Sequence, residues 1–506
     1  MTFAPRNDND LVINLLHFTT NLLHLDTRLL FMKHLPYFFI AFVLMVGCND
    51  DDDNIRSVEN DLEVEDFVWE GLNTFYYWQS DIADLDDNRF SSNKDYATFL
   101  SGFGGNPEAL FNHLLSPQDR FSFVIDDYVV LENLLNRVSK TSGMKYGLAE
   151  VALGSEEIIG FVRYVLPGTD ADTKGLERGD LFWGVDGVQL TKTNYQELLS
   201  SESDGYTLNM ASDTSGSPSG TSLTLTTAVV QENPVHVEKI IELNGQKVGY
   251  LMYNAFLSSR ETELENAFQT FQTANVDQLV LDLRYNPGGS VGIAIKLATM
   301  TTGQFDGEIF AKTQHNDKLS SWNEDYLFEN LATELNMSKI YVIVSRQTAS
   351  ASELVINGLK AHIDVVVVGE ATVGKNVGSY TIYDWIDNDG NRNPNHTWAM
   401  QPIAFKITDK NGNADFANGL STDVSQIESI GNLGILGDTN EPLLNRALQQ
   451  MGLLPQKFPN QQKFSQSVPS GKFINTEAPL LIQHLSADKQ SKMEVQLLTE
   501  SYDPKW

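Results

Sequence analysis

Hydrophobic and polar positions follow three different patterns along the chain. From about Leu62 to Val138, apolar residues recur at spacings of three and four, as in "DFVWEGLNTFYYWQSDI", which predicts amphipathic helices. Between Tyr146 and about Val230, short apolar runs separated by glycines, such as "IIGFVRYV" and "TSLTLTTAVV", predict a small β-rich module. From Val235 onward, continuous apolar runs alternate with helical patterns, which is typical of an α/β core.

The core pattern predicts individual elements. Strands are expected at "KVGYLMY", "QLVLDLR", "KIYVIVS" and "DVVVVGE", and helices near Glu261 to Gln272, Val291 to Met300 and Ser352 to Ala361. The expected fold is multi-domain α/β, with a helical N-terminal region at 62–140, the β-rich module at 141–232 and the α/β core at 235–454. A polar segment, 455–506, follows as a loosely attached tail of unknown purpose.

The chain of 506 residues, 41% of them hydrophobic, is long enough to bury several cores. Its formal charge of -32 repels nucleic acid phosphates and anionic lipid, so neither is expected as a partner. The single cysteine, Cys48, excludes an internal disulfide framework and a multi-cysteine metal site. No metal and no cofactor are expected.

An apolar run near the N-terminus has the pattern of a secretory signal. From Met32, "MKHLPYFFIAFVLMVGCNDDDDN" gives a short basic start, an apolar stretch from Leu35 to Val46, and Cys48 after a glycine. Residues 32–47 are therefore interpreted as a signal peptide, 1–31 as an over-extended start, and 48–61 as an acidic tether. A free cysteine can also be buried as a small hydrophobe.

The stretch "TASASELVINGLKAHIDVVVVGEATVGK", Thr348 to Lys375, permits two kinds of chemistry. "GEATVGKN", Gly369 to Asn376, matches the G-x-x-x-x-G-K part of a phosphate-binding loop. The next position should be a serine or threonine that binds magnesium, and here it is Asn376. An ATPase therefore stays a minor alternative, which predicts nucleotide binding dependent on Lys375.

The second kind of chemistry pairs Ser350 with Lys375. A serine hydroxyl needs a base to become a good nucleophile, and lysine can replace histidine in that role. The lysine must be neutral, which requires desolvation or a nearby positive potential to lower its pKa from about 10.4. Since both residues follow parallel strands, they are expected at the same sheet edge, where ligand crevices lie.

Backbone groups near these residues are candidate oxyanion donors. If Ser350 opens a helix, the N-H of Ala351 is the nearest candidate. A second loop, "LVLDLRYNPGG", ends in Gly288 and Gly289, which let the backbone approach a ligand closely. The structural alternatives are a capping box formed by Ser350 and Glu353, a surface position for Lys375, and an internal ion pair between Asp282 and Arg284.

Together, "DLRYNPGG", "TASASE" and "GKNVGS" resemble the carboxyl-terminal processing peptidases, the tail-specific serine proteases of family S41. The resemblance covers roughly Leu62 to Met451. It implies a ClpP/crotonase-like protease core in which Ser350 is the nucleophile and Lys375 the general base. The implied activity is that of a serine endopeptidase that acts on proteins or peptides with free C-termini.

The resemblance extends to the β-rich module, which looks like a PDZ domain in "YVLPGTDADTKGLERGDLFWGVDG". Such domains bind a carboxyl terminus as an added strand. "SGMKYGLAEV" is then the carboxylate loop and strand, with N-H groups from Tyr146, Gly147 and Leu148, although an ordinary hairpin would have the same pattern. The sequence before and including Cys48 resembles a bacterial lipobox, and the acidic run after it resembles the surface-export signals of Bacteroidetes lipoproteins. These resemblances imply an outer-membrane lipoprotein, periplasmic or surface-facing, held to the membrane through its lipid anchor only.

Three positions depart from the family pattern. The family often carries a glutamine that holds the lysine four residues after it, and here Ser379 occupies that position, so Ser379, Asn376 or a water would have to serve. Thr422 replaces a usual proline, and Thr348 replaces the first serine of the repeat. The loss of the glutamine keeps open an alternative, a non-catalytic peptide-binding lipoprotein in which a PDZ module stands on a degenerate protease core.

Overall fold

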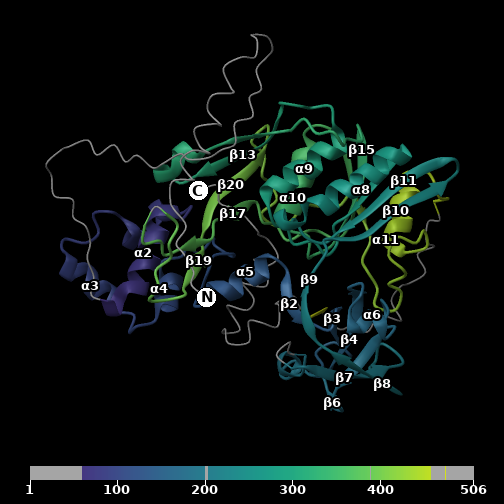
Figure 1. Cartoon of the computed structure of the whole chain (residues 1–506), viewed down its shortest axis with the longest axis horizontal. Coiled ribbons are helices and arrows are strands. Elements are labelled where there is room, and N and C mark those ends of the chain that lie inside the picture. Colours follow the sequence, from purple (N-terminus) through teal and green to yellow (C-terminus); the bar gives the residue numbers. More distant parts are fainter. Residues whose placement is uncertain (1–59, 200–202, 388, 457–472, 475–506) are drawn as a thin grey trace, which may run out of the picture. The chain divides into compact units, whose positions relative to one another are not determined.

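The protein is described here by a computed structural model that places residues 60–199, 203–387, 389–456 and 473–474 (Figure 1). The expected signal peptide, Cys48, the acidic tether and most of the C-terminal tail lie outside the described residues. Within the described part, no helix combines the length and the apolar character that a membrane crossing needs.

A six-stranded sheet organises the C-terminal half, in the order β10-β11-β12-β15-β16-β21. The strands are β10 (Val235–Leu243), β11 (Gln246–Tyr253), β12 (Gln278–Asp282), β15 (Lys339–Val344), β16 (Asp364–Gly369) and β21 (Val424–Ser425). β10 and β11 form an antiparallel hairpin, and every later pairing is parallel. The carboxyl ends of β12, β15 and β16 therefore meet at one edge of the sheet, as the sequence predicts.

Helices cover both faces of this sheet. α8 (Glu261–Ala274), α9 (Val291–Thr302) and α10 (Ala351–Lys360) share one hydrophobic cluster with Ile340 and Val342 of β15. α11 (Pro442–Gln450) shares the opposite cluster with Tyr341 and Ile343. Because neighbouring strand residues point to opposite faces, both faces of β15 are buried, and this explains its continuous apolar sequence.

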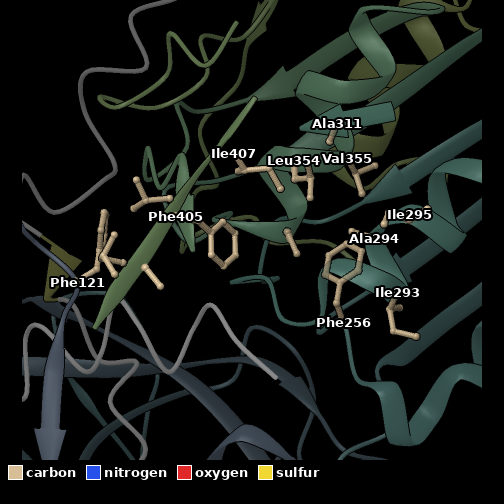
Figure 2. Close-up of a cluster of buried hydrophobic side chains, with 14 of the residues drawn as sticks. Phe121, Phe256, Ile293, Ala294, Ile295, Ala311, Leu354, Val355, Phe405 and Ile407 are labelled. Atoms are coloured by element: carbon tan, nitrogen blue, oxygen red, sulfur yellow. The ribbon is translucent and has the colours of Figure 1, made fainter. Parts of the chain in front are cut away.

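A second sheet, which the sequence pattern did not predict, lies against α10. Its order is β14-β13-β20-β17, with β13 (Ile309–His315), β14 (Asp325–Leu327), β17 (Val377–Ser379) and β20 (Ile403–Asp409). Figure 2 shows Leu354 and Val355 of α10 near Phe405 and Ile407 of β20, and all four belong to the main hydrophobic cluster.

The N-terminal region is mainly helical, as expected. It contains α2 (Glu63–Phe75), α3 (Asn93–Ser101), α4 (Pro107–His113) and α5 (Tyr128–Leu135). Between the last two helices, β1 (Phe123–Ile125) pairs with β19 (Ala399–Gln401), which pairs with β18 (Ile382–Tyr383). The local apolar spacing did not predict β1, because a pairing across more than 270 positions leaves no local periodicity.

The β-rich module follows as expected. Its sheet contains β3 (Met144–Glu150), β4 (Ile158–Val165), β5 (Leu181–Val185), β6 (Val188–Gln189), β7 (Gly205–Ala211) and β8 (Pro218–Thr226), with two short helices, α6 (Asp170–Thr173) and α7 (Tyr195–Leu198). A separate ribbon of β2 (Val138–Thr141) and β9 (Ala228–Gln231) carries the chain into and out of this module. A two-residue strand from the tail, β22 (Phe473–Ile474), pairs with β3.

Candidate active site

Ser350 lies in the turn between β15 and α10, at the start of the helix. Its backbone has φ 50° and ψ -113°, a conformation that is uncommon for a residue other than glycine and is often found at functional sites. The turn is held by the loop after β12, because Thr348 donates its hydroxyl to the Leu283 carbonyl at 2.8 Å and the Ala349 N-H donates to the Asn286 carbonyl at 3.2 Å.

Lys375 lies in the connection from β16 to β17, and its residue is only 1% exposed. The alternative of a surface lysine after a turn is therefore wrong. Its Nζ lies 5.5 Å from the centre of the Phe121 ring, which comes from the N-terminal region.

The carboxylate of Glu353, on the first turn of α10, joins the Ser350 turn to the Lys375 loop. Its Oε2 accepts the backbone N-H of Ser350 at 2.9 Å and the backbone N-H of Lys375 at 2.8 Å. Its Oε1 accepts the Gly374 N-H at 2.7 Å and the hydroxyl of Thr372. The predicted capping box therefore exists, and the same carboxylate also holds the lysine loop in place.

Glu353 is fully buried. Burial raises the pKa of Glu353 above its ordinary value, and the hydrogen bonds from Thr372, Lys375 and Gly374 oppose that rise. All of these donors favour the ionised form, so protonation or removal of this carboxylate would leave several buried donors without their acceptor.

The Asn-Pro-Gly-Gly loop after β12 lies directly against Ser350. Gly288 has φ +113°, and a Cβ added there would lie 2.9 Å from the Ser350 Cβ and 3.0 Å from the Ala351 nitrogen. The Gly288 N-H already donates to Asn286 Oδ1 at 2.8 Å. Among the described residues, the N-H groups of Gly289 and Ala351 donate to no protein acceptor, so these two are the better candidates for oxyanion donors.

A pocket opens beside these groups. Gly289, Ser350, Ala351 and Ser379 contribute to its wall, and the rest of the lining is mainly apolar: Val291, Leu354, Val377, Gly378, Phe405 and Ile407. The pocket wall next to Ser350 is therefore mainly apolar.

The two candidates for holding the lysine are placed differently. Ser379 is fully buried in β17 and lines the pocket. The side-chain amide of Asn376 donates to the Ala414 carbonyl at 2.7 Å, which turns its N-H₂ group toward the loop after β20. Of the two, Ser379 is the one at the pocket wall.

The ion pair expected between Asp282 and Arg284 is present and fully buried. Arg284 Nη2 donates to Asp282 Oδ2 at 2.7 Å, and Nη1 donates to Glu441 Oε1 at 2.7 Å and to Glu428 Oε1 at 2.9 Å. The ion pair is therefore compatible with a role for the Asn-Pro-Gly-Gly loop at Ser350. It holds the end of β12, from which that loop begins.

Sequence reasoning missed two contacts from the N-terminal region. Arg120 Nη2 donates to the Gly374 carbonyl at 3.1 Å and to the Val373 carbonyl at 3.3 Å, immediately before Lys375. The neighbouring Phe121 has its ring near the lysine ammonium group. Both residues belong to the segment "SPQDRFSF". Nothing in its local pattern indicates a contact with the loop before Lys375, some 250 positions away.

The phosphate-loop interpretation of Gly369 to Asn376 was wrong. Such a loop leads into a helix whose N-terminus binds the phosphates, and here the segment leads into strand β17. The valine run is instead strand β16, which leads toward Lys375.

The residues expected in the carboxylate loop of the module lie in a strand. Tyr146, Gly147 and Leu148 are all within β3, where they pair with Val162, Phe161 and Gly160 of β4. The assignment of these three to a loop was therefore wrong. The turn that precedes β3 is at Ser142 and Gly143, and the Gly143 backbone has φ +93°.

Two family models match the chain. The model of peptidase family S41 matches residues 247–425, which include Ser350 and Lys375, and the model of the peptidase S41 N-terminal domain matches residues 63–123, which include Arg120 and Phe121. Both matches agree with the positions of the core and of the N-terminal region in the fold.

Relatives point to the same family. A carboxyl-terminal-processing protease of Picosynechococcus is 29% identical over 215 residues, which cover 42% of this chain and 49% of the relative. The chloroplastic C-terminal processing peptidase of Tetradesmus obliquus is 30% identical over 237 residues, 44% of this chain and 49% of the relative. The chain thus spans about half the length of the curated relatives it matches.

A crystal structure from Bacteroides fragilis, described as that of an S41 protease, has a TM-score of 0.61 and 28% sequence identity to this chain, and the match covers 76% of this chain and 97% of the other. The fold is that of a multi-domain α/β protein. The core and the N-terminal region match the two models of peptidase family S41, and the fold is similar to that of an S41 protease.

Proposed function

We propose that the protein is a serine endopeptidase in which Ser350 is the nucleophile and Lys375 the general base. The observation that carries the proposal is the shared acceptor, Glu353 Oε2. It lies 2.9 Å from the Ser350 nitrogen and 2.8 Å from the Lys375 nitrogen, so these two nitrogens are at most 5.7 Å apart. Two residues 25 positions apart are thereby held as neighbours beside a pocket.

The chemistry follows from the neighbouring groups. Lys375 takes the proton of the Ser350 hydroxyl as its oxygen attacks a peptide carbonyl, and the N-H groups of Gly289 and Ala351 stabilise the negative charge on the carbonyl oxygen. The lysine then gives its proton to the departing amine, and water hydrolyses the acyl-enzyme. Burial of Lys375 excludes bulk water from the proton transfer.

The test is the loss of turnover on replacement of either residue. Ser350→Ala and Lys375→Met should each lower kcat for an unfolded protein substrate by at least about 1,000-fold, while far-ultraviolet circular dichroism stays unchanged. Lys360→Met, at the far end of α10, is the matched control and should retain full activity.

Labelling distinguishes an enzyme from the non-catalytic alternative. A serine-reactive phosphonate should modify Ser350 and leave Ser352 unmodified, because the Ser352 hydroxyl is buried and donates to the Asn286 carbonyl at 3.0 Å. A chain that forms no adduct at Ser350 and cleaves nothing would be a peptide-binding protein, and the proposal would be wrong.

The β-rich module is the proposed recognition site for substrate tails, as in a PDZ domain. Two features support this proposal. β3 pairs with β4 on one side, and on its other side it accepts a further antiparallel strand. A turn with a glycine, at Ser142 and Gly143, comes directly before β3. Main-chain pairing with β3 would hold an extended tail irrespective of most of its side chains. Carboxamide-capped tails should bind at least about tenfold more weakly than free carboxylates in fluorescence anisotropy, and equal affinity would contradict carboxylate capture.

Membrane attachment through lipidated Cys48 is likewise a proposal, which rests on the sequence alone because Cys48 lies outside the described residues. The full chain expressed in a bacterial host should partition into detergent, and Cys48→Ala should move it to the aqueous phase. If both forms partitioned alike, the cysteine would not be the attachment point.

A further inference from the structure

A short strand from the C-terminal tail occupies the outer edge of the β-rich module. Phe473 pairs with Ala149 and Ile474 pairs with Leu148, in antiparallel register with β3. On its other side, β3 pairs with β4 along its whole length. The tail therefore takes up the backbone hydrogen-bonding edge that β3 would otherwise present.

The direction of this strand matches that of the proposed substrate. Because β22 is antiparallel to β3, its chain runs from Ala149 toward Met144, and so toward the turn at Ser142 and Gly143. A substrate tail whose carboxylate is captured at that turn would run in the same direction along the same edge. Substrate and tail therefore need the same backbone groups of β3.

The contact is of a kind that a substrate can displace. Ile474 is followed by Asn475, so the segment pairs as an internal strand and has no terminal carboxylate to place at the turn. Only two residues are paired, and each backbone hydrogen bond adds little net free energy in water. What favours the contact is tethering, since a segment in the same chain reaches an effective concentration in the millimolar range.

The surface around β3 suits an extended apolar segment. Met144 and Leu148 of β3 are buried in the apolar cluster of the module, and Tyr146 packs against it partly buried. Tyr195 and Leu198 of α7 pack against the same cluster and are also partly buried. On β3 itself, an occupant of this edge can therefore cover more of the partly buried Tyr146.

We propose that the segment at Phe473 and Ile474 is a built-in competitor for the tail-binding edge, which a substrate's carboxyl-terminal tail must displace before it binds. This inference rests on the proposed function of the module. It makes the C-terminal tail a regulatory element that sets the apparent affinity for substrates and leaves the chemistry at Ser350 unaltered.

The direct test compares three chains that all carry Ser350→Ala to prevent turnover: the otherwise native chain, one with Phe473→Pro and Ile474→Pro together, and one with Ile474→Val. Consecutive residues of an antiparallel strand point their N-H groups to opposite sides, so the double proline removes whichever N-H faces β3, while valine keeps the strand. The probe is a short fluorescein-labelled peptide with an apolar free carboxyl terminus, followed by anisotropy.

The double proline chain should bind the probe roughly three- to tenfold more tightly than the native chain, and Ile474→Val should match the native chain. In chains that retain Ser350, the double proline should lower KM by a similar factor with kcat and the rate of phosphonate labelling unchanged. Equal probe affinity in all three chains would overturn the competitor role while leaving tail recognition intact. If none of the three chains bound the probe, and a chain ending at Gln456 did not bind it either, both tail recognition and the competitor role would be overturned.

Discussion

At the scale of single residues, the Glu353 carboxylate accepts hydrogen bonds from four residues at once. A capping box explains its bond to Ser350, and its bonds to Thr372, Gly374 and Lys375 are additional. The sequence indicates only the cap, because the other three partners come from a loop that the fold brings to the helix N-terminus. The role of Glu353 in holding the lysine loop therefore could not be predicted from local spacing.

Replacement of Glu353 by glutamine should lower kcat by roughly 10- to 100-fold. Glutamine has the same shape, but its amide N-H₂ group would face backbone N-H donors, and the loss of a charge-assisted hydrogen bond costs about 1.5–3 kcal/mol. The measurement is steady-state cleavage together with the rate of phosphonate labelling of Ser350.

Glu370→Gln is the matched control, because Glu370 lies in the same loop and pairs with the exposed Arg346. It should leave both rates within about twofold. Equal labelling rates in Glu353→Gln and in the native chain would show that the carboxylate does not hold the site together.

At the scale of elements, helix α10 and strand β20 form two sides of the pocket. Leu354→Ala should widen the pocket. It should raise kcat/KM for substrates with a large apolar residue before the cleaved bond, relative to kcat/KM for substrates with alanine at that position. The lost packing should lower the free energy of unfolding by about 2–4 kcal/mol. Peptide substrates that differ at this one position measure the ratio. Leu359→Ala, on the same helix and buried away from the pocket, should cost similar stability without changing the ratio.

The N-terminal region contributes to the site through the turn that carries Arg120. Asp119 Oδ1 accepts the Phe121 N-H at 2.8 Å, and its Oδ2 accepts the Tyr76 hydroxyl at 2.8 Å, so the turn is fixed to α2 and its C-cap. Arg120 in turn holds two carbonyls of the lysine loop. The N-terminal region thus helps to hold the loop that carries Lys375, the proposed base.

Arg120→Ala should lower kcat roughly three- to thirtyfold with little change in KM, because about 1–2 kcal/mol of loop support is lost next to Lys375 and not next to the bound substrate. Arg89→Ala removes an exposed pair with Asp84 and should change neither quantity. A rise in KM alone would mean that Arg120 acts on the substrate.

The elements differ in how far the sequence predicts them. Strands β11, β12, β15 and β16 were confirmed to within a few residues, because burial on both faces leaves unbroken apolar runs. Helix α10 was confirmed to within one residue. Strands β14 and β17 have three residues each, too short for any periodicity, so the sheet that lines the pocket had to be seen in the structure.

At the scale of the whole molecule, a largely buried charge network connects the β-rich module to the core. Arg178, from the turn before β5, donates to Glu428 Oε1 at 2.5 Å and to the Tyr285 hydroxyl at 2.8 Å, and Glu428 also accepts from Arg284. Although burial opposes its ionisation, Arg178 and Arg284 lower the pKa of Glu428 to about 2. The contact between module and core therefore depends on this carboxylate being charged.

Acid should weaken this contact. A carboxyl whose pKa falls on folding stabilises the fold above its ordinary pKa, and that stability is lost as the pH drops from about 5 toward 2. Glu428→Gln should therefore be less stable than the native chain at pH 7, by roughly 3 kcal/mol at most. The difference should shrink toward zero near pH 2, as measured by urea unfolding at several pH values. Glu177→Gln, an exposed neighbour of Arg178, should show no such convergence, and a constant deficit in Glu428→Gln would contradict the linkage.

The ribbon of β2 and β9 has a consequence for how such a protein is assembled from parts. Thr141 and Ala228 are paired at the end of the ribbon where the chain enters and leaves the module. Neighbouring antiparallel strands can be joined by a turn of two residues, so a short hairpin can close the core in place of everything between these two positions. The ribbon is thus a point at which the module can be exchanged for another one while the fold of the core is kept.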